Sequence, residues 1–278
     1  MTSDKLCSPF KGLYETLSED KTLLYLERIG VKDADVSEKS LGLLMKCHLE
    51  SVPFENFDVF HAHSEPSLDI NDLFEKIVIK RRGGYCFELN GLFCALLDSL
   101  GFKAESRTAR IPYGKNFPAP KAHRIIIADT GERKYFCDIG FGGPVPYSPI
   151  PLEFGKTFVC DAGRSYRFEE REDGILLETE KDGEYVPLLF FSSKASDPVD
   201  FLPLNAFCSR SCHEPFLKKQ MMWRLTREGI KYSLNGGLLK ITGGERDEEY
   251  ILDTEDALRE ALDKYFGVKY DGSLRAWL

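Results

Sequence analysis

The stretch around Cys86 places a cysteine where a buried helix is expected to begin. Apolar residues follow it at the three- and four-residue spacing of a helix face, at Leu89, Leu92, Phe93, Leu96, Leu97 and Leu100. Gly101 then stands where a left-handed helix stop is expected. Gly83 and Gly84 allow a tight turn that brings backbone N–H groups near the sulfur, and the helix dipole favours a thiolate. The sequence therefore predicts a nucleophilic cysteine at position 86.

A packing role is the alternative for each of the eight cysteines, because cysteine is among the most buried residue types. Cys94 lies two helical turns after Cys86 in the same predicted helix. The other six lack the preceding pair of glycines, namely Cys7, Cys47, Cys137, Cys160, Cys208 and Cys212. Local sequence thus separates Cys86 from the rest.

Two groups of histidines and cysteines are possible metal ligands. The first is Cys47 and His48 with His61 and His63, and the second is Cys208, Cys212 and His213. Neither has the paired spacing of a structural zinc site, so we expect packing or loop roles and no metal.

The composition is that of a soluble globular protein with reduced thiols. The chain has 278 residues, of which 42% are hydrophobic and 29% charged, with a net charge of −8. This excludes a disordered chain and makes nucleic acid an unlikely partner. The first residues lack an apolar signal segment, and no run approaches the roughly 18 apolar residues of a membrane span. We therefore expect a cytoplasmic protein with free cysteines and no membrane partner.

The pattern of apolar residues divides the chain into three predicted regions. Residues 1–102 are mostly helical, residues 103–202 contain short strands typical of an antiparallel sheet or barrel, and residues 203–278 contain strands followed by a closing helix. The predicted strands are 103–111, 123–128, 133–139, 175–179, 185–191, 223–226, 231–234 and 237–242, and the closing helix is 254–266. Because no long alternation of strands and helices occurs, the class is α+β and not a doubly wound α/β fold.

A histidine and an aspartate are expected to meet across two of these strands. The strands 123–128 and 133–138 flank a compact turn, Asp129 to Glu132. A loop of two or four residues places His123 directly opposite Asp138, with Cβ atoms about 4.5 to 5.5 Å apart. A three-residue loop would change the register.

The same strand face carries apolar residues, namely Ile125, Ile127 and Phe136. His123 and Asp138 would therefore lie at the end of a buried surface, where a carboxylate needs a partner. A packed core pair is the alternative. Together with Cys86, the pair forms a hypothetical nucleophilic triad: His123 takes the Cys86 proton and forms an ion pair with the thiolate, and Asp138 fixes the tautomer of His123.

Four motifs resemble those of the arylamine N-acetyltransferase family. They are Val52-Pro53-Phe54-Glu55-Asn56, Arg82-Gly83-Gly84-Tyr85-Cys86-Phe87-Glu88-Leu89-Asn90, Ala122-His123-Arg124 and Asp138-Ile139-Gly140-Phe141-Gly142, in the family's order and spacing. The resemblance implies an N-terminal helical bundle, an antiparallel β-barrel domain and a C-terminal α/β lid. It also implies a Cys-His-Asp triad like that of transglutaminases and papain-like cysteine proteases.

The resemblance further implies ping-pong acetyl transfer. Acetyl-coenzyme A acylates Cys86, free coenzyme A leaves, and the amine of an arylamine or arylhydrazine attacks the thioester. Phe141 resembles the aromatic residue that contacts the acceptor ring, and Gly142 and Tyr85 are the other expected substrate-binding residues. Acetyl-coenzyme A is a co-substrate, and no permanently bound cofactor is implied.

The expected donor region departs from the family pattern. Residues 205–216 keep the family's Asn205 and Phe216, but several hydroxyl and proline positions between them are replaced. The resemblance assigns coenzyme A contacts to Phe207 and Ser209. Several basic residues could offset the anionic coenzyme, namely Lys121, Arg124, Arg210, Lys218 and Lys219.

Two other functions use the same residues differently. A cysteine amidohydrolase or an amide synthase would keep the triad with another acyl donor, and a binding module would keep it only as a packed core. The residues leave open the natural acceptor, the length of the acyl group and the oligomeric state.

Overall fold

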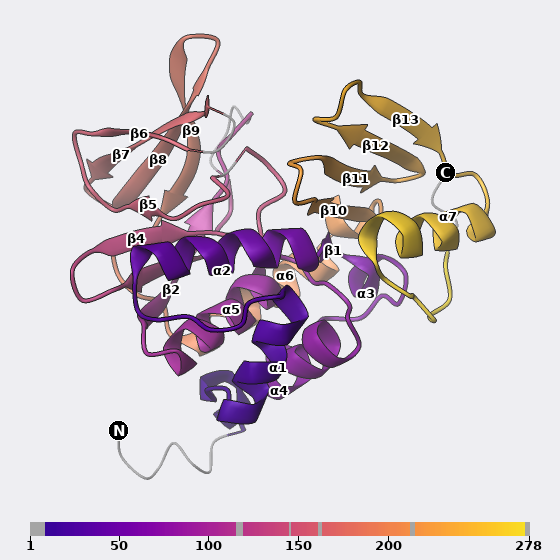
Figure 1. The fold of residues 1–278 in the computed structure, drawn as a ribbon, viewed down its shortest axis with the longest axis horizontal. Helices are drawn as coiled ribbons and strands as arrows, with labels where there is room; N and C mark the ends of the chain where they lie inside the picture. The colour runs from indigo at the N-terminus through magenta and orange to yellow at the C-terminus, as the bar shows by residue number, and fades with distance from the viewer. Residues whose placement is uncertain (1–8, 115–118, 145, 161–162, 212–214, 276–278) are drawn as a thin grey trace.

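The computed structural model describes residues 9–114, 119–144, 146–160, 163–211 and 215–275. A set of helices lies against two antiparallel sheets, one of eight strands and one of five (Figure 1). This arrangement confirms the predicted α+β class.

The helices of the N-terminal part follow the predicted apolar faces. They are α1 (Glu19–Ile29), α2 (Glu38–Ser51), α3 (Phe57–Phe60), α4 (Ile70–Phe74) and α5 (Cys86–Ser99), with short turns at Lys11–Tyr14 and Glu75–Ile79. Ser18 caps α1 by accepting a hydrogen bond from the Lys21 N–H, and Gly30 ends it in the left-handed region at φ +76°. Asp69 caps α4 by accepting a hydrogen bond from the Asn71 N–H.

The helix α5 lies at the centre of the helical region. All of its residues from Cys86 to Leu97 are buried, and it contacts α1, α4 and two strands of the larger sheet. Its start is fixed by Glu88, whose Oε2 accepts a hydrogen bond from the Tyr85 N–H at 3.0 Å. Gly101 follows its end at φ +92°. The predicted helix, with Cys86 as its first residue, is therefore confirmed.

The larger sheet has the order β5-β4-β3-β2-β9-β8-β7-β6. Its strands are β2 (Lys103–Arg110), β3 (His123–Asp129), β4 (Lys134–Cys137), β5 (Ile150–Pro151), β6 (Thr157–Val159), β7 (Ser165–Arg171), β8 (Gly174–Lys181) and β9 (Glu184–Phe191). The end strands β5 and β6 are joined by residues 152–156 alone, a segment that spans at most about 20 Å. The sheet must therefore curve into a nearly closed barrel, in agreement with the expected antiparallel barrel.

The predicted register between β3 and β4 is wrong by two residues. Asp129 pairs with Lys134 and Ile126 with Cys137, so the loop consists of residues 130–133. The Thr130 N–H donates to the Arg133 carbonyl at 3.0 Å, which moves the turn one residue further along the chain than the predicted turn. His123 is therefore not directly opposite Asp138, which lies just beyond the end of β4. A shift of two residues leaves every side chain on its predicted face, because the period of a strand is two.

The smaller sheet has the order β1-β10-β11-β12-β13. Its strands are β1 (Phe54–Glu55), β10 (Met221–Leu225), β11 (Lys231–Asn235), β12 (Leu238–Thr242) and β13 (Glu248–Ile251). The strand β1 joins the N-terminal part of the chain to this sheet by pairing Phe54 with Trp223. The predicted closing helix is α7 (Glu255–Ala261), which is capped by Thr254 and continues into a π-helical turn, Leu262–Phe266.

One helix and several strands were not among the predicted elements. The helix α6 (Phe201–Arg210), preceded by a turn at Pro198–Asp200, carries Pro203 in its first turn, where proline is tolerated although it obscures the helical pattern. The missed strands are β1, β5, β6, β7 and β13. The division of the chain at residues 102 and 202 stays a prediction.

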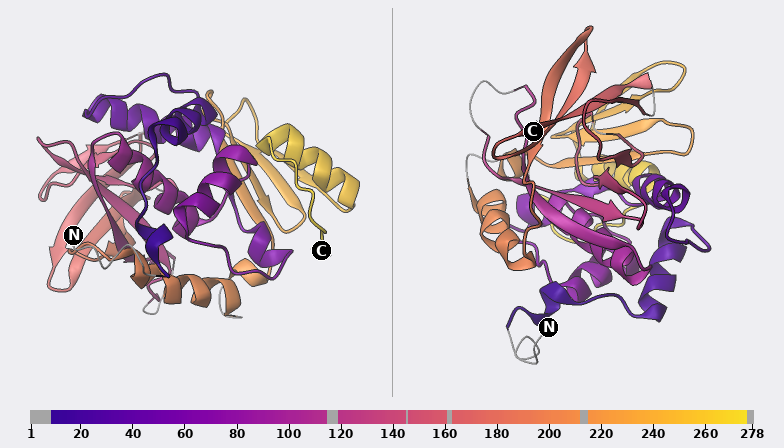
Figure 2. Two further views of the ribbon diagram at one scale, coloured as in Figure 1. Left: turned by 90° about the horizontal axis from the view of Figure 1, so that it is seen from below. Right: turned by 90° about the vertical axis from the view of Figure 1, so that its left-hand side faces the viewer.

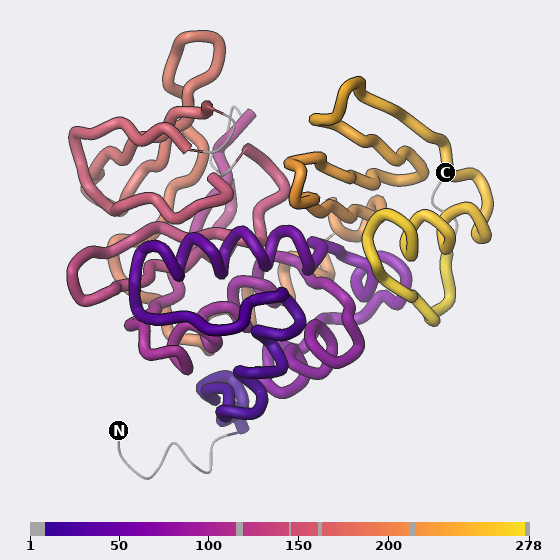
Figure 3. Tube along the Cα trace, in the orientation of Figure 1, coloured from indigo at the N-terminus to yellow at the C-terminus, as the bar shows by residue number. Residues whose placement is uncertain are grey.

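The path of the chain explains how distant residues meet. Figure 2 shows α2 and α6 on opposite sides of the helical region, and both contribute buried residues to the core around α5. Figure 3 shows the chain passing from the larger sheet through α6 into the smaller sheet. The start of α5 therefore lies where the helices and both sheets come together.

Candidate active site

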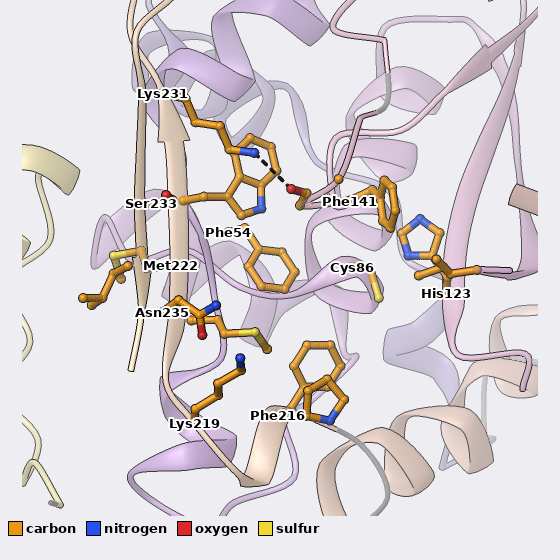
Figure 4. Close-up of a pocket in the computed structure, with 18 of the residues that line it drawn as sticks. Phe54, Cys86, His123, Phe141, Phe216, Lys219, Met222, Lys231, Ser233 and Asn235 are labelled. Carbon is orange, nitrogen blue, oxygen red and sulfur yellow. Dashed lines mark hydrogen bonds between the residues drawn. The ribbon is translucent and has the colours of Figure 1, made fainter. Parts of the chain in front are cut away.

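A cavity of about 670 Å³ opens between the start of α5, the loop after β4 and the smaller sheet. Cys86, His123 and Phe141 line it, together with residues of β10, β11 and β12. Figure 4 shows Cys86 and His123 on one side, and Lys231, Ser233 and Asn235 on the other. The structure therefore brings Cys86 and His123 to one cavity, as predicted.

Cys86 is the first residue of α5 and is only 3% exposed. Its Sγ lies 3.8 Å from the carbonyl oxygen of Ala122, the residue before His123. Burial raises the pKa of the Cys86 thiol, and His123 opposes this rise through its charge and a hydrogen bond. The thiolate of Cys86 therefore depends on His123 for its stabilisation.

His123 and Asp138 are in direct contact. His123 Nε2 lies 2.6 Å from Asp138 Oδ2, and both side chains are buried. Burial alone would lower the pKa of His123, but the charges and hydrogen bonds of Asp138 and Cys86 outweigh it and raise the pKa to about 10. Because Nε2 contacts Asp138, Nδ1 is the ring nitrogen left for Cys86. The predicted contact thus exists, although the register that led to it was wrong.

Asn90 is a residue of this site that the sequence reasoning missed. Its Nδ2 donates to Asp138 Oδ1 at 2.9 Å, and the Gly140 N–H donates to the same oxygen at 2.9 Å. The signal was present in the sequence, since Asn90 closes the cysteine motif one helical turn after Cys86.

Gly140 allows the loop after β4 to approach α5 closely. A Cβ atom at this position would lie 2.7 Å from Cys86 Cα and 2.9 Å from Asn90 Nδ2. Any larger residue would push the loop that carries Asp138 away from the helix that carries Cys86.

The three predicted substrate-binding residues are placed differently. Phe141 and Gly142 line the cavity, and the Phe141 ring lies 5.4 Å from the His123 ring. Tyr85 is fully buried and is not among the lining residues: its hydroxyl donates to Asn205 Oδ1, and its ring packs on Phe216, which does line the cavity. Tyr85 therefore supports the cavity wall from behind.

The predicted coenzyme A contacts are not brought to the cavity. Ser209 is buried, and its hydroxyl donates to the Asn205 carbonyl of its own helix at 2.8 Å. Phe207 is 39% exposed on α6 and is not among the lining residues. Among the basic residues considered, Arg124 is buried beside the Phe201 ring and Arg210 pairs with Glu65, while Lys219 lines the cavity. Lys121 and Lys218 are not among the lining residues.

Three lysines line the cavity, and two of them were not predicted. They are Lys219, Lys231 and Lys240, and the described lining contains no carboxylate. Lys231 Nζ donates to the Gly142 carbonyl at 3.0 Å and lies 5.1 Å from the centre of the Trp223 ring, whereas Lys240 pairs with Glu249. The cavity is therefore cationic although the protein has a net charge of −8.

Two of the histidines considered as metal ligands have side-chain partners of another kind. His48 Nε2 contacts the Tyr25 hydroxyl at 3.0 Å, and His61 Nε2 contacts Gln220 Oε1 at 2.9 Å. Within the described ranges, no group of three or more His, Cys, Asp or Glu residues could hold a metal ion. Cys7, Cys212 and His213 lie outside the described residues.

No helix in the described part of the chain is long and apolar enough to cross a membrane.

Comparison with known proteins identifies the family. The N-acetyltransferase family model matches residues 39–275. The arylamine N-acetyltransferase of Escherichia coli K12 is 30% identical over 241 residues, which cover 86% of this chain and 85% of that protein. The chain belongs to the arylamine N-acetyltransferase family. The resemblance found in the four motifs is thus confirmed.

Solved structures of the family share this fold. Mycobacterium marinum arylamine N-acetyltransferase aligns with a TM-score of 0.82 at 28% identity, covering 89% of this chain and 93% of that one. The same M. marinum enzyme in complex with CoA aligns with a TM-score of 0.79 at 29% identity, over 88% and 92% of the two chains. Among curated relatives, the Mycolicibacterium smegmatis arylamine N-acetyltransferase is 29% identical over 250 residues, covering 88% of this chain and 90% of that protein.

Proposed function

We propose that this protein transfers acetyl from acetyl-coenzyme A to the nitrogen of an aromatic amine or hydrazine, through a thioester on Cys86. The observation that carries the proposal is the placement of Cys86 and His123 at one cavity in a member of this family, with Asp138 buried 2.6 Å from His123. Acetyl-coenzyme A is the co-substrate, as the CoA complex of the M. marinum relative suggests.

The first half of the reaction acylates the cysteine. His123 accepts the Cys86 proton, the thiolate attacks the acetyl carbonyl carbon, and the bond from that carbon to the coenzyme sulfur breaks. The proton on His123 then passes to the departing coenzyme thiolate. Asp138 supports this step by holding Nε2 of His123, so that Nδ1 is presented to Cys86.

The second half returns the enzyme to its starting state. The amine nitrogen attacks the thioester carbon, neutral His123 accepts the amine proton, and the bond to Cys86 Sγ breaks. Phe141 lies beside His123 and offers an aromatic face to the acceptor ring. Gly142 allows the backbone to approach the acetyl group.

The charge of the cavity supports an anionic ligand. Acetyl-coenzyme A carries several phosphate charges, and the described lining supplies lysines without any carboxylate. We assign the phosphates to Lys219 and Lys231, which line the cavity, whereas Phe207 and Ser209 are not among its lining residues. The cytoplasmic location stays a prediction.

Intact-protein mass after mixing with acetyl-coenzyme A, without any acceptor, tests the proposal. We expect a gain of one acetyl group that maps to Cys86 and that an arylamine or hydrazine removes. Cys86→Ser should fold without gaining the acetyl group, because an alcohol ionises far less readily than a thiol. No acetyl gain on a Cys86 that still reacts with iodoacetamide would overturn the donor assignment and favour an amide synthase or amidohydrolase with another donor.

A further inference from the structure

Asn90 lies one helical turn after Cys86 on α5, so the two side chains share a face of that helix. The Asn90 side chain is fully buried. A buried amide must have partners for both its N–H donors and its carbonyl oxygen, and those partners identify what it holds.

All of the hydrogen bonds of the Asn90 amide go to elements that carry the other two triad residues. Its Nδ2 donates to Asp138 Oδ1 at 2.9 Å and to the Arg124 carbonyl at 2.6 Å. Its Oδ1 accepts from the Ile139 N–H at 3.1 Å. Arg124 and Ile139 directly follow His123 and Asp138 in the chain, so one side chain connects three separate segments.

The amide cannot reverse its orientation without losing these bonds. Exchanging its oxygen and nitrogen would place an acceptor against Asp138 and the Arg124 carbonyl, and a donor against the Ile139 N–H. Asp138 Oδ1 is therefore held by Asn90 and by the Gly140 N–H, which leaves Oδ2 to face His123.

We propose that Asn90 is the positioning residue of the triad: it fixes the Asp138 carboxylate and the end of β3 relative to Cys86, and so keeps the His123 ring aimed at the sulfur. This inference rests on the proposed function, because it takes Cys86, His123 and Asp138 as the reacting triad. Asn90 itself is not among the residues that line the cavity, and it acts through Asp138 and the backbone beside His123.

A matched control exists in Asn56, a second buried asparagine with the same number of hydrogen bonds. Asn56 is 2% exposed, and its amide bonds to the carbonyls of Phe216 and Lys219 at 2.9 Å each and to the Met221 N–H at 2.7 Å. None of these partners belongs to the triad. All three partner residues line the cavity, so Asn56→Ala is a control for thiolate reactivity alone: it removes an equally buried amide without releasing Asp138.

The test is the rate of iodoacetamide alkylation of Cys86 as a function of pH, read by peptide mapping so that the other cysteines do not interfere. It needs neither donor nor acceptor. We expect wild type and Asn56→Ala to keep a reactive thiolate at mildly acidic pH. In Asn90→Ala the alkylation rate at mildly acidic pH should fall about 10- to 100-fold. This factor corresponds to the free energy of one lost hydrogen bond to a charged group. The rate of acetylation at saturating acetyl-coenzyme A should fall alongside it, with KM little changed.

Asn90→Ser provides a second variant, since its hydroxyl can still donate one hydrogen bond, and it should give an intermediate pH profile. Circular dichroism establishes that each variant is folded. If both folded Asn90 variants kept the wild-type pH profile, Asn90 would be only a structural residue and the inference would be overturned. If wild type itself titrated as an ordinary thiol, the triad would be wrong, and with it the proposed function.

Discussion

Asn90 Nδ2 lies 2.9 Å from Asp138 Oδ1, so a hydrogen bond joins the helix that begins at Cys86 to the loop that carries the carboxylate. The other carboxylate oxygen contacts His123 Nε2. Asp138 thus accepts hydrogen bonds at both oxygens. Because a carboxylate can only accept, neutral His123 must carry its ring proton on Nε2.

Asp138→Asn tests this dependence on an acceptor. If the new amide oxygen faces Asn90 and the Gly140 N–H, its NH₂ group faces His123 and turns Nε2 into an acceptor. The ring proton then lies on Nδ1, and this nitrogen can no longer accept the proton of Cys86. We expect the single-turnover rate of Cys86 acetylation to fall by about a thousandfold or more. A rate within a few-fold of wild type would show that the Asp138 contact does not set the tautomer.

The sequence predicted the contact between His123 and Asp138 for a reason that was only partly right. Strand periodicity placed both on the face with Ile125, Ile127 and Phe136, and this face is buried in the structure. The exact pairing could not be predicted, because Asp129 extends β3 and the turn forms one residue later, at 130–133. The predicted strand face was still correct because the register was wrong by an even number of residues. To predict the register between β3 and β4 exactly, one would need the geometry of the turn, and the four polar residues of the turn do not determine it.

Gly140→Ala should separate the Asp138 loop from α5. The added Cβ would lie 2.7 Å from Cys86 Cα, a backbone atom that cannot move aside. We expect a loss of about 1–3 kcal/mol in the free energy of unfolding and a much larger loss of acetylation rate. Urea denaturation and single-turnover acetylation measure the two effects.

Gly42→Ala is the control for this variant, because its Cβ would meet its nearest neighbour, Pro149, at an ordinary 3.6 Å in the middle of α2. It should keep full activity and gain up to about 1 kcal/mol from the better helix propensity of alanine. Equal activity of Gly140→Ala and Gly42→Ala would mean that the loop can retreat from Cys86 without consequence.

Lys231→Met should weaken the binding of the anionic donor. Lys231 has no carboxylate partner among the described residues, whereas Lys240, in the same cavity, pairs with Glu249 at 2.5 Å. We expect Lys231→Met to raise the KM for acetyl-coenzyme A about tenfold at low salt, and Lys240→Met to raise it less. The difference should shrink as ionic strength rises, because salt screens exposed charges. An unchanged KM in Lys231→Met would remove this lysine from the donor site.

The cavity illustrates what the sequence could not reveal. Cys86 and His123 were identifiable from local motifs, but Lys231 and Lys240 lie on strands whose position depends on β1 pairing with β10. This pairing joins Phe54 to Trp223 across most of the chain, and no local pattern indicates it. Phe207 and Ser209, expected at the donor site from the family pattern, stay predictions, because α6 places neither among the residues that line the cavity.

His48 should make the fold sensitive to acid. It is fully buried, and burial lowers its pKa to about 3, with the charge of Arg28 acting in the same direction. In the unfolded chain the pKa returns to about 6.5, so between these values the unfolded state binds a proton that the folded state does not. Stability is therefore lost as the pH falls below about 6.5, by about 1.4 kcal/mol per pH unit for this residue.

Urea denaturation of wild type and His48→Gln across pH 4 to 7 measures this contribution. In His48→Gln the free energy of unfolding should fall less steeply as the pH is lowered. The two slopes should differ by about 1.4 kcal/mol per pH unit, the value for one proton. His61, whose pKa burial lowers to about 4, and Glu88, whose pKa burial raises to about 7, also titrate in this range, but both are present in the two proteins and cancel in the difference. His123, whose folded-state pKa is raised to about 10, is also present in both proteins and cancels in the difference. Parallel curves for the two proteins would mean that His48 accepts a proton in the folded state, against the burial that the structure gives it.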